Sequence, residues 1–253
     1  MTLVDAHVHV DGYGDGWPVA RAEMRGHGIV SLAVSMDVAS YRASVALSRE
    51  EPSILPSFGI HPWNAPAWAR RLHELEELVD GALMLGEVGL DRRFVKDEEA
   101  FGPQEEVFTF FLDAARRTGK ILNLHTSGAE ALIAERMRDA GGPLAVVHWY
   151  NGPMRPLAAL TDLGAYFSVG VEVLRSDRIA RVARRIPLDR LLSETDNPGG
   201  WAWLEGREGR PALLERVVER LAEVRAMDRD DMADLLEANA RRLLAAGGVP
   251  WPA

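Results

Sequence analysis

The chain repeats one pattern: a short apolar run of strand length is followed by a helix-length amphipathic stretch, after which the next apolar run begins. Eight such runs can be counted, at residues 3–6, 28–34, 53–59, 82–85, 121–124, 144–147, 165–169 and 191–193. Strands that alternate with helices form a parallel sheet covered by helices, and eight such units close into a barrel. The sequence therefore predicts an α/β fold, a (β/α)8 TIM barrel.

The same pattern predicts one domain that spans residues 1–253. No low-complexity segment, long linker or internal repeat divides the chain, and a length of about 250 residues is typical of such a barrel. Residues 67–79 and 104–118 carry apolar side chains at three- and four-residue spacing, which predicts helices. Residues 211–246 predict two further helices, the first ending near Arg225.

Composition excludes several kinds of function. The 29 lysines and arginines against 38 acidic residues give a net charge of −9, which excludes a protein-wide basic field for nucleic acid, so phosphate binding must be local. The absence of cysteine excludes thiolate nucleophiles and cysteine-based metal sites. No segment reads as a signal peptide or a membrane span, so we expect a cytoplasmic protein without membrane association.

Residues that can bind metals follow the apolar runs at the point where each predicted strand ends. They are His7 and His9 after the first run, His61 after the third, Glu87 after the fourth, His125 after the fifth, His148 after the sixth and Asp196 after the eighth. In a barrel these positions share the C-terminal face, where active sites are built. Two pairs of histidines, a carboxylate between them and a terminal aspartate suit two adjacent divalent ions, which a carboxylate can bridge.

Each of these residues also has an ordinary interpretation when it is taken alone. A single histidine at a strand end is more often hydrogen-bonded than metal-binding. Glu87 could cap the next element, and Asp196 could form an Asx turn. His7 and His9 are two residues apart, so on a strand both side chains point to the same side. The convergence of all seven side chains on one face is what favours a metal centre.

Aromatic and basic residues near these positions are candidates for binding a substrate. Trp63, Trp149, Trp201 and Trp203 are predicted to ring the mouth of the barrel, either as stacking platforms or as apolar plugs. His61 stands at a strand end without a second candidate ligand, so its imidazole is expected to face the substrate. Arg92 is the nearest candidate cation for a phosphate.

Taken together, the motifs resemble those of the TatD family of metal-dependent hydrolases, a branch of the amidohydrolase-like barrels. The resemblance covers almost the whole chain and rests on the segments Asp-Ala-His-Val-His (5–9), Gly-Ile-His-Pro (59–62), Gly-Glu-Val-Gly-Leu-Asp (86–91), Leu-His (124–125), His-Trp-Tyr-Asn-Gly (148–152) and Glu-Thr-Asp (194–196). The resemblance implies a distorted barrel, two divalent ions that are magnesium, manganese or zinc, and deoxyribonuclease activity.

The family pattern implies a role for each matching residue. One ion would be held by His7, His9, Glu87 and Asp196, and the other by Glu87, His125 and His148. The implied catalytic residues are Asp196, Glu87 and His61, with Asp196 as both ligand and proton acceptor and His61 at the scissile phosphate. The expected substrate contacts are His61, Arg92, Trp63, Trp149 and Asn151.

The chain departs from the family pattern at positions near the substrate. Trp63 stands where the family usually has a second histidine, Thr126 and Ser127 stand where it has an arginine, and Asn151 replaces a serine or threonine. Arg92 and Arg93 replace an aromatic pair. These departures leave the predicted metal ligands intact and put the DNA specificity in question.

Three hypotheses about function therefore remain open. The first is a nuclease that cleaves DNA or a small phosphodiester with a metal-activated water, in the manner of a 3′–5′ exonuclease. The second is a two-metal amidohydrolase-type enzyme that acts on an amide, ester or lactone, because the same ligands polarise carbonyl groups. The third is a metal-stabilised, non-catalytic subunit of a larger assembly. The protein itself is expected to be a monomer or a subunit of a larger complex.

Overall fold

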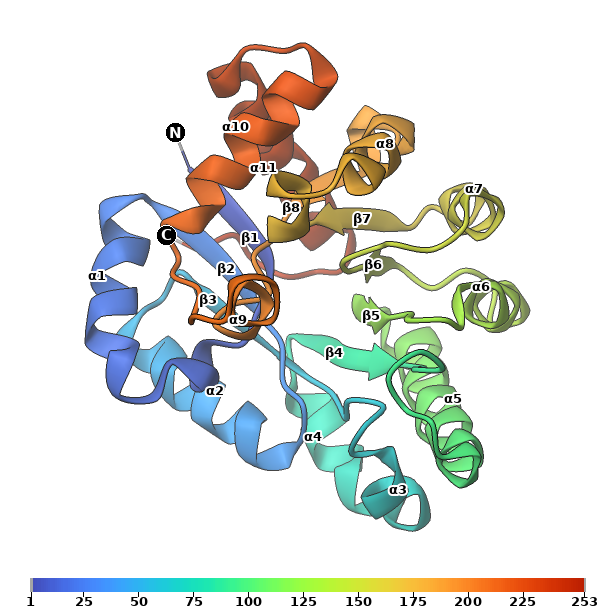
Figure 1. Cartoon of the computed structure of the whole chain (residues 1–253). Coiled ribbons are helices and arrows are strands. Elements are labelled where there is room, and N and C mark those ends of the chain that lie inside the picture. The colour runs from blue at the N-terminus through green and yellow to red at the C-terminus, as the bar shows by residue number, and fades with distance from the viewer. Residues whose placement is uncertain (1, 253) are drawn as a thin grey trace.

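The computed structural model describes residues 2–252, in which eight parallel strands follow one another in chain order around a ring (Figure 1). The strands are β1 (Leu3–Val8), β2 (Ile29–Ala33), β3 (Ile54–Phe58), β4 (Met84–Gly89), β5 (Leu122–His125), β6 (Ala145–Val147), β7 (Tyr166–Val169) and β8 (Leu191–Ser193). Each strand from β1 to β7 pairs in parallel with the next one. The predicted α/β barrel is therefore confirmed.

Helices surround the ring of strands, as Figure 1 shows. They are α1 (Trp17–Gly26), α2 (Val38–Glu50), α3 (Ala65–Trp68), α4 (Glu76–Gly81), α5 (Phe101–Thr118), α6 (Glu130–Asp139), α7 (Met154–Asp162), α8 (Asp177–Arg185), α9 (Gly199–Glu205), α10 (Leu213–Arg225) and α11 (Arg229–Ala246). The single helix predicted over residues 67–79 is wrong. The chain there forms α3, a 3-10 helix at Ala69–Leu75 and α4, because the backbone of Arg71 leaves the helical region at φ −132° and ψ 19°. The two predicted C-terminal helices are confirmed as α10 and α11.

The last strand meets the first through buried side chains that close the ring. The carboxylate of Asp5 accepts hydrogen bonds from the Thr195 backbone N–H at 2.9 Å and from the Thr195 hydroxyl at 2.6 Å. Burial raises the pKa of Asp5 to about 7, although these hydrogen bonds act to lower it. Just beyond β8, the backbone N–H of Asp196 donates to the carbonyl of His7 at 2.9 Å. The closure therefore joins the two chain segments that carry candidate metal ligands.

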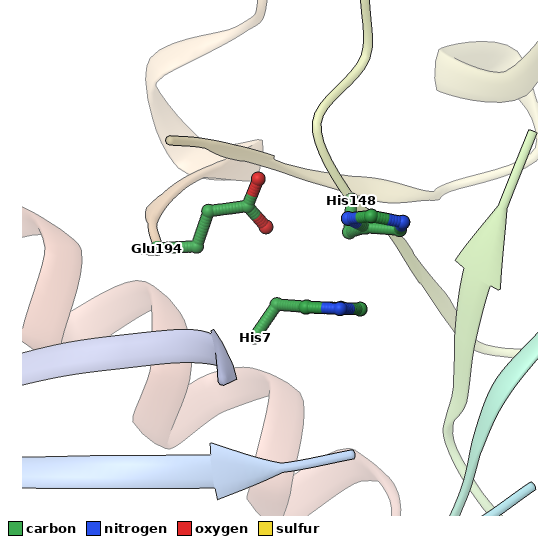
Figure 2. A group of neighbouring side chains, drawn as sticks. All are labelled: His7, His148 and Glu194. Atoms are coloured by element: carbon green, nitrogen blue, oxygen red, sulfur yellow. The ribbon is translucent and has the colours of Figure 1, made fainter. Parts of the chain in front are cut away.

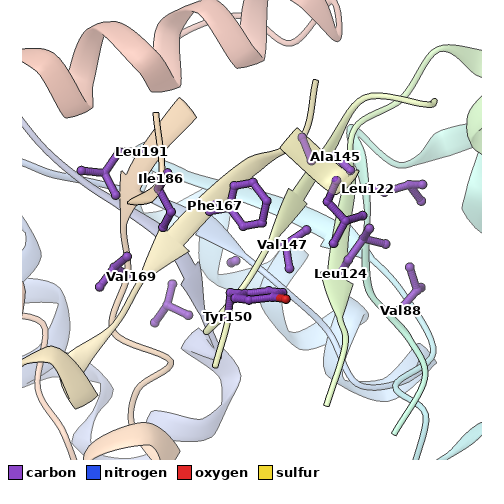
Figure 3. Packing of buried hydrophobic residues seen from close by; sticks show 14 of the residues in the cluster. Val88, Leu122, Leu124, Ala145, Val147, Tyr150, Phe167, Val169, Ile186 and Leu191 are labelled. Carbon is purple, nitrogen blue, oxygen red and sulfur yellow. The ribbon is translucent and has the colours of Figure 1, made fainter. Parts of the chain in front are cut away.

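Two apolar clusters lie on opposite sides of the sheet. The larger one fills the space between the strands and the surrounding helices, and Figure 3 shows part of it along β4 to β8, with Phe167 and Val147 among its members. The smaller cluster draws residues from all around the ring, Val4 and Leu192 among them, and therefore fills the barrel interior. Leu243 of α11 joins the smaller cluster, so α11 packs across the N-terminal end of the barrel. The opposite, C-terminal end is left for polar residues.

An irregularity in β1 decides where its histidines point. Val4 and Ala6 belong to the interior cluster, so strict alternation along the strand would turn His7 outward. The pairing of β1 with β2 shifts register between Asp5 and Val8. Such a bulge moves the following side chains to the other face of a sheet. His7 is therefore aimed into the barrel.

Strand β4 carries the matching irregularity. Met84 lies in the interior cluster, and its pairing with β5 shifts register between Leu85 and Val88. Glu87 falls within the shift, which turns its carboxylate toward the interior in the same way as His7. Each of the two irregular strands therefore supplies a polar residue to the same end of the barrel.

Glycines permit the strands to approach one another closely beside these residues. A Cβ atom at Gly59 would lie 2.4 Å from the carbonyl oxygen of Glu87, and one at Gly89 would lie 1.9 Å from the carbonyl oxygen of His125. Gly89 also has a φ of +147°, which side chains rarely allow. Within residues 2–252, no helix has the length and apolarity that a bilayer crossing requires.

We expect Gly89→Ala to lower the free energy of unfolding by more than about 2 kcal/mol, because the methyl group would overlap a strand carbonyl. Chemical denaturation monitored by circular dichroism measures this change. Gly81→Ala is the matched control, because Gly81 ends α4 with no atom within 4 Å of the added Cβ. An equally small effect of both substitutions would contradict the close approach of β4 and β5.

Candidate metal centre

The first group of candidate ligands lies between β1, β4 and the segment after β8. The Nε2 atoms of His7 and His9 each lie 3.4 Å from Oε2 of Glu87. They lie 3.5 and 3.3 Å, respectively, from Oδ1 of Asp196. Around an ion with metal–nitrogen distances of about 2.0–2.1 Å, tetrahedral geometry separates the ligand atoms by about 3.3 Å. These four side chains are therefore spaced as the ligands of one ion.

The second group surrounds the other oxygen of the same glutamate. Oε1 of Glu87 lies 2.8 Å from Nδ1 of His125, 2.9 Å from Nε2 of His148 and 3.4 Å from Nε2 of His61. Each carboxylate oxygen of Glu87 therefore faces its own set of imidazoles. A carboxylate that bridges two neighbouring ions requires this arrangement.

An unpartnered nitrogen tests whether a cation fits the first group. His7 is fully buried, and its Nε2 has no hydrogen-bond partner, whereas its Nδ1 lies 2.8 Å from Oδ1 of Asn123. Buried polar atoms nearly always have a partner. A metal-binding histidine commonly holds its ring in place through the nitrogen that does not bind the metal. The geometry at His7 therefore fits a cation bound at Nε2.

The protonation states of Glu87 and His148 suit cation binding. Burial by itself raises the pKa of Glu87, but the imidazoles of His61, His148 and His7 outweigh burial and hold this pKa well below its usual value. Burial, reinforced by His7, lowers the pKa of His148 to about 4. At neutral pH the glutamate is therefore an anion and the His148 imidazole is neutral, as metal ligation requires.

Glu194 supports the centre from the side of β8. The rings of His7 and His148 are stacked with their centroids 3.8 Å apart, and the carboxylate of Glu194 ends beside them (Figure 2). Each of these three residues offers a possible ligand atom within 4.8 Å of the others. The carboxylate also accepts hydrogen bonds from the Trp149 backbone N–H at 2.8 Å and from the hydroxyl of Ser168. Burial raises the pKa of Glu194 to about 8.

Asp91 is a functional residue to which sequence reasoning assigned no role. Its Oδ2 lies 3.2 Å from Nε2 of His125 and accepts a 2.8 Å hydrogen bond from the indole of Trp63. Its Oδ1 accepts backbone hydrogen bonds from Arg93 and Phe94. Burial lowers the pKa of His125, but hydrogen bonds to Asp91 and Glu87 outweigh it and raise this pKa to about 9. Asp91 therefore orients His125. The position of Asp91 directly after β4, in the Gly-Leu-Asp segment, is the sequence signal that could have identified it.

One pocket opens over these groups. Its lining includes His9, His61, Glu87, His125, His148 and Asp196, together with Trp63, Phe94, Trp149, Asn151 and Trp203. The candidate ligands, except the fully buried His7, are thus accessible from the same space as the aromatic residues. A substrate in this pocket would lie against both.

Residues 4–245 match the family described as TatD related DNase. The chain belongs to this family. It is 30% identical to an uncharacterized metal-dependent hydrolase, YcfH, of Escherichia coli K12, over 96% of both chains. It is 25% identical to deoxyribonuclease TATDN3 of Homo sapiens, over 95% of this chain and 94% of that protein. The crystal structure of YjjV, a TatD homologue from Escherichia coli K12, superposes with a TM-score of 0.87 at 23% identity, over 98% of both chains. This protein is a metal-dependent hydrolase.

Two sequence-based expectations about the mouth of this TatD-related hydrolase need correction. Arg92 does not line the pocket, because its guanidinium donates to Gln104 at 2.8 Å and to Glu105 at 3.2 Å and lies 3.8 Å above the ring of Phe101. Trp201 is buried in the core and does not line the mouth. Trp63, Trp149 and Asn151 do line the pocket, but Trp63 uses its indole N–H to bind Asp91.

We expect Asp91→Ala to weaken metal binding about tenfold or more, because His125 would lose the partner that orients its ring. Titration calorimetry of the chelator-treated protein with manganese or zinc measures this affinity. Asp113→Ala is the control, since Asp113 is an exposed residue of α5 that pairs with Arg116. Unchanged affinity in Asp91→Ala would show that His125 keeps its orientation without this carboxylate.

Proposed function

We propose that this hydrolase is a deoxyribonuclease and that residues 1–253 form one catalytic domain. The proposed centre holds two divalent ions, with His7, His9, Glu87 and Asp196 at one position and Glu87, His125 and His148 at the other. The two oxygens of Glu87, each facing a separate set of imidazoles, are the observation that carries this proposal. Family membership and the similarity to deoxyribonuclease TATDN3 support DNA as the substrate.

Magnesium, manganese or zinc ions would supply Lewis acidity and neutralise charge on the phosphate oxygens. Asp196 is the proposed proton acceptor. It lines the pocket with a side chain that is 23% exposed, whereas Glu87 is almost fully buried. A general base must reach the proton that it removes. Of the candidate carboxylates, Asp196 is the one whose side chain is partly exposed to the pocket.

His61 is proposed to bind the scissile phosphate. Its Nδ1 accepts a 3.2 Å hydrogen bond from the Trp63 backbone N–H, and burial lowers the pKa of its imidazole. The neutral ring therefore carries its proton on Nε2, near Glu87 and the pocket. An N–H group at this position can donate to a phosphate oxygen, which supports a substrate contact in preference to a third imidazole ligand on the second ion.

One observation favours a carbonyl substrate as the second candidate. Among residues 2–252, no lysine or arginine lines the pocket, and the chain carries a net charge of −9. Amides, esters and lactones need no cation for recognition, and the same ions can polarise a carbonyl group. A panel of such compounds is the alternative if DNA is not cleaved.

We expect the protein supplied with manganese or magnesium to cleave labelled single-stranded DNA, and Asp196→Asn to reduce turnover by at least about a thousandfold. The substitution removes both a proposed ligand and the proposed base, while circular dichroism should show an intact fold. Labels at the 3′ and 5′ ends distinguish stepwise 3′–5′ removal from internal cleavage. Asp97→Asn, at an exposed cap before α5, is the control. If the parent protein leaves DNA intact, the nuclease proposal fails.

We expect Glu87→Gln to weaken both metal positions together, because each carboxylate oxygen faces one of them. Calorimetry and metal analysis of the purified protein report the number of ions bound and their affinities. Glu105→Gln, on the outer face of α5, serves as the control. Two ions bound with parental affinity in Glu87→Gln would exclude Glu87 as the bridge.

A further inference from the structure

Three aromatic side chains form one continuous surface in the pocket, here named the aromatic wall: Phe94, Trp149 and Trp203. The ring of Trp203 meets Phe94 at a centroid distance of 6.4 Å and Trp149 at 6.0 Å, both nearly edge to face. Trp203 is 64% exposed and Phe94 is 47% exposed. Large apolar groups exposed beside a catalytic centre commonly mark a binding surface. The wall is therefore a candidate for contact with the substrate.

The fold holds Trp149 in a restrained conformation. Its φ is +39°, a value that is uncommon for residues other than glycine. Its backbone N–H donates to Glu194 at 2.8 Å, and its indole N–H donates to Glu172 at 2.6 Å. A Cβ atom at Gly200 would lie 2.9 Å from the Trp149 ring and 3.2 Å from the Cβ of Asp196. A glycine at position 200 therefore leaves room for the Trp149 ring directly beside Asp196, the proposed proton acceptor.

Helix α9 presents Trp203 at the pocket for a simple geometric reason. Two residues along an α-helix correspond to a rotation of about 200° around its axis, so the two side chains point to nearly opposite sides. Trp201 is 2% exposed and packs in the core, so it fixes α9 in place. Trp203 then points away from the core toward the pocket.

The aromatic wall has no basic neighbour among the described residues that line the pocket. No basic side chain of the described residues lines the pocket, and the arginine nearest to Phe94 in sequence, Arg93, donates to Asn151 at 2.8 Å. Binding at the wall must therefore depend on flat apolar surfaces. A nucleobase offers such a face only when it is unstacked from its neighbours.

We infer that the aromatic wall binds, by stacking, the nucleobase next to the bond that is cleaved. This inference rests on the proposed nuclease function and extends it. It states that the substrate is recognised through a nucleobase and not through a series of phosphates. A base inside a duplex has both faces covered, so the wall selects a base at a strand end or in a single strand. Phe94 and Trp203 are then specificity-determining residues of this chain.

The test compares deoxyadenosine 5′-monophosphate with deoxyribose 5-phosphate, in which a hydroxyl group replaces the base. Calorimetry with the manganese-loaded protein should show that the nucleotide binds about tenfold more tightly. Trp203→Ala and Phe94→Ala should each remove most of this difference and leave the binding of the sugar phosphate unchanged. Trp203→Phe should keep most of it, because a phenyl ring also stacks. Leu83→Ala is the control, since Leu83 is 41% exposed and lies outside the pocket lining.

Neither ligand contains a phosphodiester bond, so this experiment does not depend on cleavage. Equal affinity of the parent protein for both ligands would overturn the inference even if the protein cleaves DNA. Equal weakening of both ligands by Trp203→Ala would also overturn it, because that result indicates general damage to the pocket. A base preference that disappears in the wall variants while the parent protein leaves DNA intact would support stacking of a nucleobase on the wall and contradict only the proposed nuclease function.

Discussion

The buried carboxylate of Glu87 is the group around which the C-terminal end of the barrel is organised. An anion in a nearly water-free site is costly unless positive or hydrogen-bonding groups surround it. Imidazoles from β1, β5 and the segments after β3 and β6 face its two oxygens. The same arrangement that stabilises the charge holds the imidazoles in the two groups that would bind the proposed ions. The same side chains therefore determine both the stability of this end of the barrel and its capacity to bind metal.

Residues that contact the candidate ligands limit the conformations that the ligand side chains can adopt. Asn123 fixes the ring of His7, and Asp91 fixes the ring of His125. Glu194 holds the backbone at Trp149, while Asp5 ties β1 to the segment after β8. A ligand set that is already oriented loses little conformational entropy on binding an ion. By holding the candidate ligands in place, these contacts would contribute to metal affinity.

The mouth of the pocket differs in character from its floor. The floor combines imidazoles and carboxylates, whereas the mouth is aromatic, and its neighbouring arginines are occupied by Gln104, Glu105 and Asn151. A nuclease that follows long DNA gains affinity from many phosphate contacts. Among residues 2–252, no lysine or arginine lines the pocket to make such phosphate contacts. The arrangement suits the proposed substrate, a short or single-stranded DNA that would present one phosphate to the ions and one base to the wall.

The amino-acid sequence by itself determined the barrel and the candidate ligand set. Alternation of apolar runs with amphipathic segments requires parallel strands covered by helices, and the parallel direction brings every strand end to one face. His125 and His148 could therefore be placed together without coordinates.

What only the tertiary structure decided is the direction in which particular side chains point. The register shifts in β1 and β4 turn His7 and Glu87 inward, although alternation along the strand would turn His7 outward. Arg92 is drawn to side chains of α5, and Trp201 is buried while Trp203 is exposed. Each of these outcomes depends on neighbours that are distant in sequence, such as the strand paired alongside or the helix packed against it. A periodic pattern along one segment carries no information about those neighbours, because it records only the average face of that segment.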